Sequence, residues 1–392
     1  MTRHDRSVRR PFGPPRSSRP RERGFTLIEL LVSMTVMLLV IGSVFTLLDP
    51  SQATSRTQPE AADVLQRLRI SADSLEKDLL MAGAGTYSGA IAGTLANYFP
   101  PILPYRTGIL PDPGLSYFED RISIVYVPDT ASQTTVWDSM PQTSSEIKVH
   151  AQPGCPDVKP PDNLCGFKEG MRVLIFDDTG AYDFFTITQV QSTGTEGHLQ
   201  HNTTMNASKE LSKKYNELPD HAKIAQVATV VYWLDPATRQ LMLYDGTDPF
   251  NAIPLVDNVA GLRFRYYGDP NPPLDPHIPG TANCIVDAAG SPLLPVLPSN
   301  GSSLVELPGT MLTDGPVCGS GATAFDADLF RVRKVSVQVR TQAAAPEMRG
   351  VNPTGGGQVL FQNPGTSNSP YRRVPDAVVE FDVTPRNLNL VR

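Results

Sequence analysis

A run of 24 residues near the start of the chain contains a single ionisable side chain. It reads FTLIELLVSMTVMLLVIGSVFTLL, from Phe25 to Leu48, and its one charged residue is Glu29. Because each helical residue rises about 1.5 Å, a helix of this length spans about 36 Å, enough to cross a bilayer core of about 30 Å. We therefore expect a membrane-spanning helix whose apolar run ends at Asp49-Pro50.

The charges on the two sides of this run are unequal. Residues 1–24 carry eight Arg, one Asp and one Glu, whereas the whole 392-residue chain has a formal net charge of −6. Positive charge on the N-terminal side of a first span predicts a cytoplasmic N-terminus and an exported body. Because that body is acidic, nucleic-acid binding is disfavoured as its main activity.

Two simple interpretations of the apolar run are a cleaved secretory signal and a plain single-span anchor. The run is longer than the apolar part of a signal peptide, and its end, VFTLL at residues 44–48, offers no small-residue cleavage site. A plain anchor fits the length but does not explain Glu29, since a carboxylate costs roughly 2–3 kcal/mol near the membrane centre and less near an interface. The sequence therefore favours a functional carboxylate that a partner neutralises.

The segment RGFTLIELLV, residues 23–32, resembles the class III signal of type IV prepilins and type II secretion pseudopilins. The resemblance implies that a prepilin peptidase cuts after Gly24 on the cytoplasmic side of the membrane and methylates Phe25, the new N-terminus. Glu29 then becomes the fifth residue of the mature chain, the position that this family uses for assembly. The resemblance also implies contact with other minor pilins or pseudopilins through the N-terminal helix.

The chemistry of these residues supports such an assembly role. Cleavage after Gly24 creates a positively charged amine at one end of an apolar helix, and the Glu29 carboxylate of a neighbouring subunit can lie beside it. Each charge alone is costly in hydrocarbon, and pairing offsets much of that penalty. We therefore expect the pair to fix the axial register between subunits, and the uncleaved basic leader to block docking.

A second helical pattern follows, from about residue 59 to 82. Its apolar residues recur every three or four positions and are Leu65, Leu68, Ala72, Leu75, Leu79 and Ala82. We expect this stripe to pack on a sheet and Gly83-Ala84-Gly85 to end the helix. We also expect Pro50 and Pro59 to cause a kink or a break between the two helical segments. The string VLQRLRISADSLEKDLLMAGAG resembles PilW-like minor pilins and J-type (PulJ-like) pseudopilins.

The rest of the chain has the period of β-strands. Predicted strands cover residues 121–127, 171–176, 184–190, 225–234, 240–244, 261–267, 329–341 and 377–383. Turn residues at 177–180 and 235–239 predict two hairpins. Strands that follow one another without helices favour an antiparallel sheet, so the fold class is α+β, a pilin-like helix packed on a β-sheet head. The segments VVYWLDPATRQLMLYDG, PLVDNVAGLRFRYYGD and RVRKVSVQVRTQ resemble the J-type pattern in their order.

Long polar segments rich in Pro and Gly separate these strands. They cover roughly residues 86–118, 129–166, 191–222, 268–326 and 343–374, and we interpret them as loop insertions. The expected organisation is a cleaved leader at 1–24, a membrane or filament-core helix at 25–48, an amphipathic helix at 49–85 and an exported β-rich head at 86–392.

The four cysteines all lie in these segments. An even number in an oxidising compartment predicts disulfides, and four cysteines allow three connectivities. Proximity in the sequence favours pairing Cys155 with Cys165 and Cys284 with Cys318. A zinc site is the alternative, but there is no C-x₂-C spacing and no neighbouring His.

Other candidate sites have weaker support. His198 and His201 could bind a metal weakly, but we expect them in a solvated loop, and we interpret the acidic groups at 177–183 and 326–328 as plain turns rather than calcium loops. No nucleotide-binding or hydrolase motif occurs, so we predict no enzyme activity, no metal and no cofactor.

These observations predict a structural protein. The first hypothesis is a minor pilin processed at Gly24–Phe25, anchored in the inner membrane with its head exported, and then assembled into a type IV pilus-like filament whose tip it helps to initiate. A type II secretion pseudopilin of J type is the alternative within that class. A tip adhesin is an alternative from another class, and a single-span enzyme facing the periplasm is a third.

Overall fold

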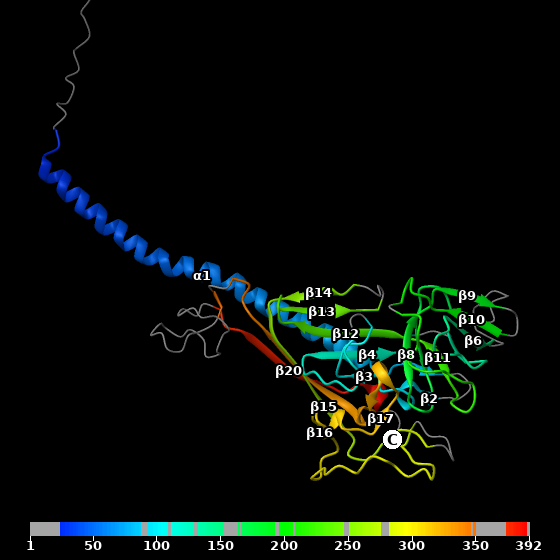
Figure 1. The fold of residues 1–392 in the computed structure, drawn as a ribbon. Coiled ribbons are helices and arrows are strands. Elements are labelled where there is room, and N and C mark those ends of the chain that lie inside the picture. The colour runs from blue at the N-terminus through cyan, green and yellow to red at the C-terminus, as the bar shows by residue number, and fades with distance from the viewer. Residues whose placement is uncertain are drawn as a thin grey trace, which may run out of the picture. The chain divides into compact units, whose positions relative to one another are not determined.

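The structure is a computed structural model (Figure 1). It describes residues 24–87, 93–108, 111–128, 132–151, 164, 166–192, 196–206, 208–246, 251–275, 282–345, 348–349 and 374–389. For residues 46–56, 86–87 and 93–94 it describes the backbone alone. The chain divides into two compact units, Met1–Arg56 and Thr57–Arg392.

One helix, α1, extends from Leu27 to Met81. It continues through Pro50 and Pro59, so the predicted break is wrong. A proline removes one backbone hydrogen bond and crowds the preceding turn, but long helical segments on both sides can continue through it. The helix ends where the sequence indicates, since Gly83 and Gly85 follow it with positive φ angles of 66° and 84°.

In the second unit, one stripe of α1 is buried. Its buried residues are Val64, Leu68, Ser71, Leu75, Leu79 and Ala82. The predicted stripe is therefore wrong in its first half, because Leu65 is 52% exposed and Ser71 is buried in place of Ala72. Both sets of positions fit a helical period, and Ser71 tolerates burial because its hydroxyl donates a hydrogen bond to the Arg67 carbonyl oxygen at 2.9 Å.

The strands of the first half of the second unit are short. They are β1 (Thr86–Tyr87), β2 (Gly93–Thr94), β3 (Ile102–Leu103), β4 (Arg121–Tyr126), β5 (Gln133–Thr135), β6 (Glu146–His150), β7 (Arg172–Phe176), β8 (Tyr182–Thr186), β9 (Gln189–Ser192) and β10 (Glu196–Gln200). One 3₁₀ helix, η1 (Leu95–Asn97), lies between β2 and β3.

Longer strands dominate the second half. They are β11 (Lys223–Gln226), β12 (Ala228–Asp235), β13 (Gln240–Tyr244), β14 (Ile253–Asp257), β15 (Val259–Gly268), β16 (Val305–Leu307), β17 (Val317–Cys318), β18 (Phe325–Asp326), β19 (Val332–Thr341) and β20 (Ala377–Val383). Short 3₁₀ helices are η2 (Met311–Thr313), η3 (Gly321–Thr323), η4 (Ala327–Arg331) and η6 (Arg386–Leu388).

These strands pair antiparallel in several sheets, so the α+β class is confirmed (Figure 1). The orders are β14-β13-β12-β4-β3, β16-β15-β19-β20, β5-β11-β7-β8 and β6-β10-β9, with the two-stranded pairs β1-β2 and β17-β18. Both predicted hairpins are confirmed, since β7 pairs with β8 and β12 pairs with β13.

The sheets enclose two main hydrophobic cores. The larger core joins the stripe of α1 to the five-stranded sheet and to β15 and β19. The smaller core lies among β5 to β11, and β7 separates the two, because Leu174 and Phe176 belong to the larger core while Val173 and Ile175 belong to the smaller.

The smaller core corrects one prediction. Two segments interpreted as loop insertions, 129–166 and 191–222, contain β5, β6 and β10 and contribute Ile147, Val149 and Leu199 to this core. Only alternate residues of β6 and β10 are fully buried, and their neighbours are polar, so each strand carries few apolar residues. The described parts of these two segments therefore form folded structure rather than extended loops.

Candidate functional site

The apolar start of α1 is the first candidate site. The stretch Leu27–Phe45 is long and apolar enough to cross a membrane, and none of it is buried within the structure. Its 19 residues span about 28 Å as a helix. An apolar helix with no protein partner of its own needs lipid or other subunits to cover it.

Hydroxyl groups within this stretch are satisfied inside the helix. Ser33 Oγ donates to the Glu29 carbonyl oxygen at 2.7 Å, and Ser43 Oγ donates to the Val40 carbonyl oxygen at 2.7 Å. Thr35 Oγ1 lies 2.8 Å from the Val32 carbonyl oxygen. Hydroxyls paired in this way do not demand water, so the stretch suits an apolar environment.

Glu29 lies in the first turn of the helix and closes a capping box with Thr26. The Thr26 backbone N–H donates to Glu29 Oε2 at 2.9 Å, and Thr26 Oγ1 donates to the same oxygen at 3.0 Å. In return, the Glu29 backbone N–H donates to Thr26 Oγ1 at 3.4 Å. The pattern Thr-x-x-Glu before an apolar run is the sequence signature of this arrangement, and the capping box was not among the features predicted above.

Gly24 and Phe25 precede the helix. Both are exposed, Phe25 to 86%, and an added Cβ at Gly24 would meet no atom within 4 Å. Packing among the described residues therefore does not require glycine at position 24. Residues 1–23 of the expected leader lie outside the described residues.

The structure joins one of the two expected cysteine pairs. Cys284 and Cys318 form a disulfide with a Cα–Cα distance of 5.1 Å. This bridge links the segment after β15 to β17, and both half-cystines are buried. Cys155 and Cys165 lie outside the described residues.

The two candidate histidines do not lie in a solvated loop, so that expectation is wrong. His198 is in β10, where its Nδ1 lies 2.6 Å from Glu146 Oε1 and its Nε2 lies 3.3 Å from Glu196 Oε1. His201 is fully buried against Phe185, with a ring-centroid distance of 4.8 Å. Burial lowers the pKa of His201 to about 4, so at neutral pH this ring is uncharged.

The acidic group after β7 is more than a plain turn. Asp177 accepts a hydrogen bond from Lys213 Nζ at 2.7 Å, and Asp178 accepts one from Lys223 Nζ at 2.5 Å. Asp177, Asp178 and Lys223 are all buried. Buried charges persist only when paired, so these two ion pairs attach the turn to the segment around β11.

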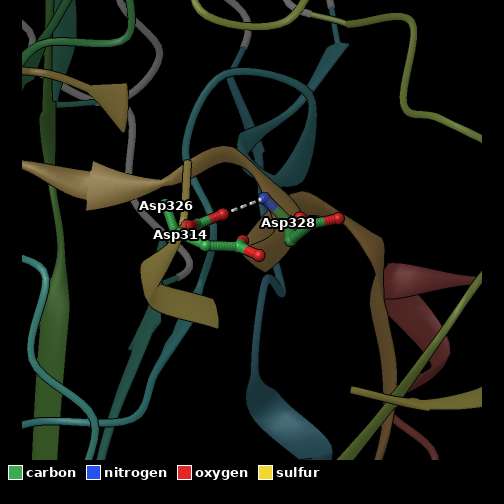
Figure 2. A group of neighbouring side chains, drawn as sticks. All are labelled: Asp314, Asp326 and Asp328. Carbon is green, nitrogen blue, oxygen red and sulfur yellow. Dashed lines mark hydrogen bonds between the residues drawn. The ribbon is translucent and has the colours of Figure 1, made fainter. Parts of the chain in front are cut away.

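Three aspartates could hold a cation. Asp314, Asp326 and Asp328 each place one carboxylate oxygen so that all three lie within 4.8 Å of one another (Figure 2). Asp326 caps η4 by accepting from the Asp328 backbone N–H at 2.8 Å, and Asp328 pairs with the buried Arg331. Burial raises the pKa of Asp328 to about 6 even beside that guanidinium. Asp326 and Asp328 therefore already have protein donors, and capping and ion pairing explain where these two carboxylates lie.

Comparison with known proteins gives one match. The model of the prokaryotic N-terminal methylation motif matches residues 19–45. The matched range covers Gly24, Phe25, Glu29 and the apolar start of α1. No curated protein and no solved structure matches the chain.

Proposed function

We propose that this chain, which carries the N-terminal methylation signal of type IV pilins and pseudopilins, is a minor subunit of a type IV pilus-like filament. The observation that carries the proposal is the exposed apolar stretch Leu27–Phe45 directly after the signal, with Glu29 at its start. The motif points to a structural subunit, and the function proposed here is structural, not enzymatic.

Processing is the first step of the proposed function. A prepilin peptidase cleaves the Gly24–Phe25 bond and methylates the amine of Phe25. Before cleavage the basic leader holds the N-terminus in the cytoplasm, while the helix crosses the inner membrane and the unit from Thr57 onward is exported. The exposed position of Gly24, where an added Cβ would meet no atom of the described residues within 4 Å, supports access by a peptidase.

Assembly is the second step. Within a filament the Glu29 carboxylate pairs with the Phe25 amine of a neighbouring subunit, and this pair sets the register between helices. The two hydrogens that Thr26 donates to Glu29 in the isolated chain hold the carboxylate at the start of the helix. A carboxylate has room for several donors, so one oxygen can keep the cap while the other meets the amine.

A low-copy position at the filament tip follows from the size of the head. The second unit holds two hydrophobic cores and several sheets, so it is bulky beside a single helix. Bulky heads fit poorly along a densely packed shaft, and they fit at an end. A J-type pseudopilin of a type II secretion system is the second candidate, because pili and secretion machines use the same signal.

The test compares cells with and without the prepilin peptidase gene. The proposal predicts that the shortened chain appears only when the peptidase is present, and that only this form enters the sheared filament fraction. Deleting the gene for this chain should reduce the number of surface pili if it serves a pilus, and should reduce enzyme secretion if it serves a secretion system. A chain that stays full-length beside an active peptidase contradicts the proposal.

A further inference from the structure

A small cavity lies in the second unit, away from the N-terminal helix. It has a volume of about 160 Å³, and its wall includes Tyr105, Thr107, Arg172, Tyr182 and Phe184. These residues come from the segment after β3 and from strands β7 and β8. At about 30 Å³ for each water molecule, the cavity has room for a small molecule or for one side chain.

Arg172 brings a positive charge to this cavity without a counter-ion. Its guanidinium lies over the Phe184 ring, 5.5 Å from the centroid, and its Nε is buried with no hydrogen-bond partner. Among the residues that the structure describes, no carboxylate forms an ion pair with it. Burial lowers the pKa of this guanidinium.

Arg172 as a whole is half-buried, and a fully buried arginine shows what full compensation looks like. Arg331 is fully buried, and its guanidinium pairs with Asp328 and donates to the carbonyl oxygens of Pro270 at 3.0 Å and Pro295 at 2.6 Å. Breaking a buried ion pair by removing one partner is strongly destabilising, so unpaired arginines are rarely retained. Arg172 therefore stands out as a cation that lacks its partner.

A second polar atom on the same wall also lacks a partner. Thr107 Oγ1 is buried and forms no hydrogen bond, although the Thr107 backbone N–H donates to Ser123 Oγ at 3.0 Å. The large majority of buried side-chain polar atoms in proteins are paired. Thr107 and Arg172 both line the cavity, and the charge of Arg172 favours an anionic guest there.

The carboxylates on the wall are already engaged. Asp112 accepts from Arg106 Nη2 at 2.8 Å and from Arg121 Nη1 at 2.6 Å. Asp183 accepts from Ser212 Oγ at 2.7 Å and from a tyrosine hydroxyl at 2.8 Å. Asp112 is therefore neutralised by its two arginines, whereas Asp183 is held through Oδ2 by neutral hydroxyl groups and forms no ion pair with Arg172 among the described residues.

Two tyrosines can supply one more donor. The hydroxyl oxygens of Tyr105 and Tyr182 lie 3.3 Å apart, and burial raises the pKa of both, so both stay protonated. Their mutual bond uses one of the two hydroxyl hydrogens. The other hydrogen is left for a guest in the cavity.

We propose that this cavity binds a carboxylate, held by Arg172 and assisted by Thr107 and the tyrosine pair. A guanidinium and a carboxylate are both planar and match in two parallel hydrogen bonds. The Phe184 and tyrosine rings suit the apolar stem that carries such a group. The carboxylate comes either from a small free acid or from an acidic side chain of a partner protein.

Calorimetric titration of the full-length chain in detergent tests this proposal, with sodium chloride holding the ionic strength constant. Acetate and propionate reproduce the ends of Asp and Glu side chains, and benzoate represents a free acid with a ring. Wild type should bind saturably, Arg172→Gln should weaken binding about tenfold to hundredfold, and Thr107→Val should weaken it several-fold. Arg69→Gln removes an exposed guanidinium from α1 and should leave affinity unchanged.

The ranking of the acids identifies the source of the carboxylate. Benzoate binding about tenfold tighter than acetate indicates a free acid, and propionate binding at least as well as benzoate indicates a partner side chain. Thermal melting without added acid checks the variants, and Arg172→Gln should melt no lower than wild type because it loses an uncompensated charge. Any one of three results overturns the proposal. They are equal binding of the acids to wild type and Arg172→Gln, no saturable binding of any of the three acids, and a strongly lowered melting temperature for Arg172→Gln.

Discussion

Three substitutions at the start of α1 separate the two roles that Glu29 can have. Glu29→Gln keeps a side-chain acceptor for Thr26, so the capping box survives while the charge is lost. Thr26→Val removes the hydroxyl of the cap and leaves the carboxylate charged. Glu29→Val removes both the acceptor and the charge.

The expected magnitudes differ enough to be measured. Loss of a helix cap costs about 1 kcal/mol, whereas breaking a buried ion pair by removing one partner costs about 3–5 kcal/mol. At about 1.4 kcal/mol for each tenfold change, cap loss lowers assembly about fivefold and charge loss lowers it at least about a hundredfold. We therefore expect Glu29→Gln to be as defective as Glu29→Val, and Thr26→Val to be only mildly defective.

The assay is the amount of processed chain in sheared filaments divided by the amount that remains in the membrane. Mass analysis of both fractions must first show normal cleavage, so that a processing defect is not mistaken for an assembly defect. Glu29→Gln at wild-type level in filaments, with Thr26→Val strongly reduced, refutes the charge argument and leaves Glu29 as a helix cap.

Three further predictions concern the second unit. In the folded chain the pKa of His201 is about 4, below the usual 6.5, so wild type should lose up to about 3 kcal/mol of stability as pH falls from 6.5 to 4. His201→Leu should remove this pH dependence. Denaturant unfolding of both proteins across that pH range measures the difference. Replacing both Cys284 and Cys318 by Ala should lower the free energy of unfolding by roughly 3–4 kcal/mol, since the bridge closes a loop with a sequence separation of 34. Thermal melting of the oxidised parent and of the double variant checks this. Gly85→Ala should lower the free energy of unfolding by more than about 2 kcal/mol, because φ at position 85 is +84° and the new Cβ would lie 2.3 Å from the Val127 carbonyl oxygen. A melting temperature within a degree or two of wild type contradicts that reasoning.

The parts of the fold with strong local patterns could be predicted from the sequence. The apolar run is helical from Leu27 onward, β20 has the expected bounds, and the turn at 235–239 joins two paired strands. These features depend on hydropathy, period and turn residues, which neighbouring positions specify by themselves. The signal around Glu29 could likewise be read directly, because its residues are contiguous.

Features set by tertiary contacts could not be predicted in the same way. Val64 rather than Leu65 is buried because packing selects between two stripes that fit a helical period equally well. His201 looks like a loop residue in a polar string, yet it lies beside Phe185 inside the smaller core. Arg172 and Thr107 line the same cavity although they are distant in the sequence, so no local pattern predicts the cavity.

The proposed account depends most on the N-terminus of the chain found in filaments. Intact-mass analysis of the protein from sheared filaments should show a chain that begins at Phe25 and carries one methyl group on its amine. The same analysis of the membrane fraction from cells without the peptidase should show the leader still attached. Filaments that contain the chain with Met1 and its arginine-rich leader intact would contradict the account.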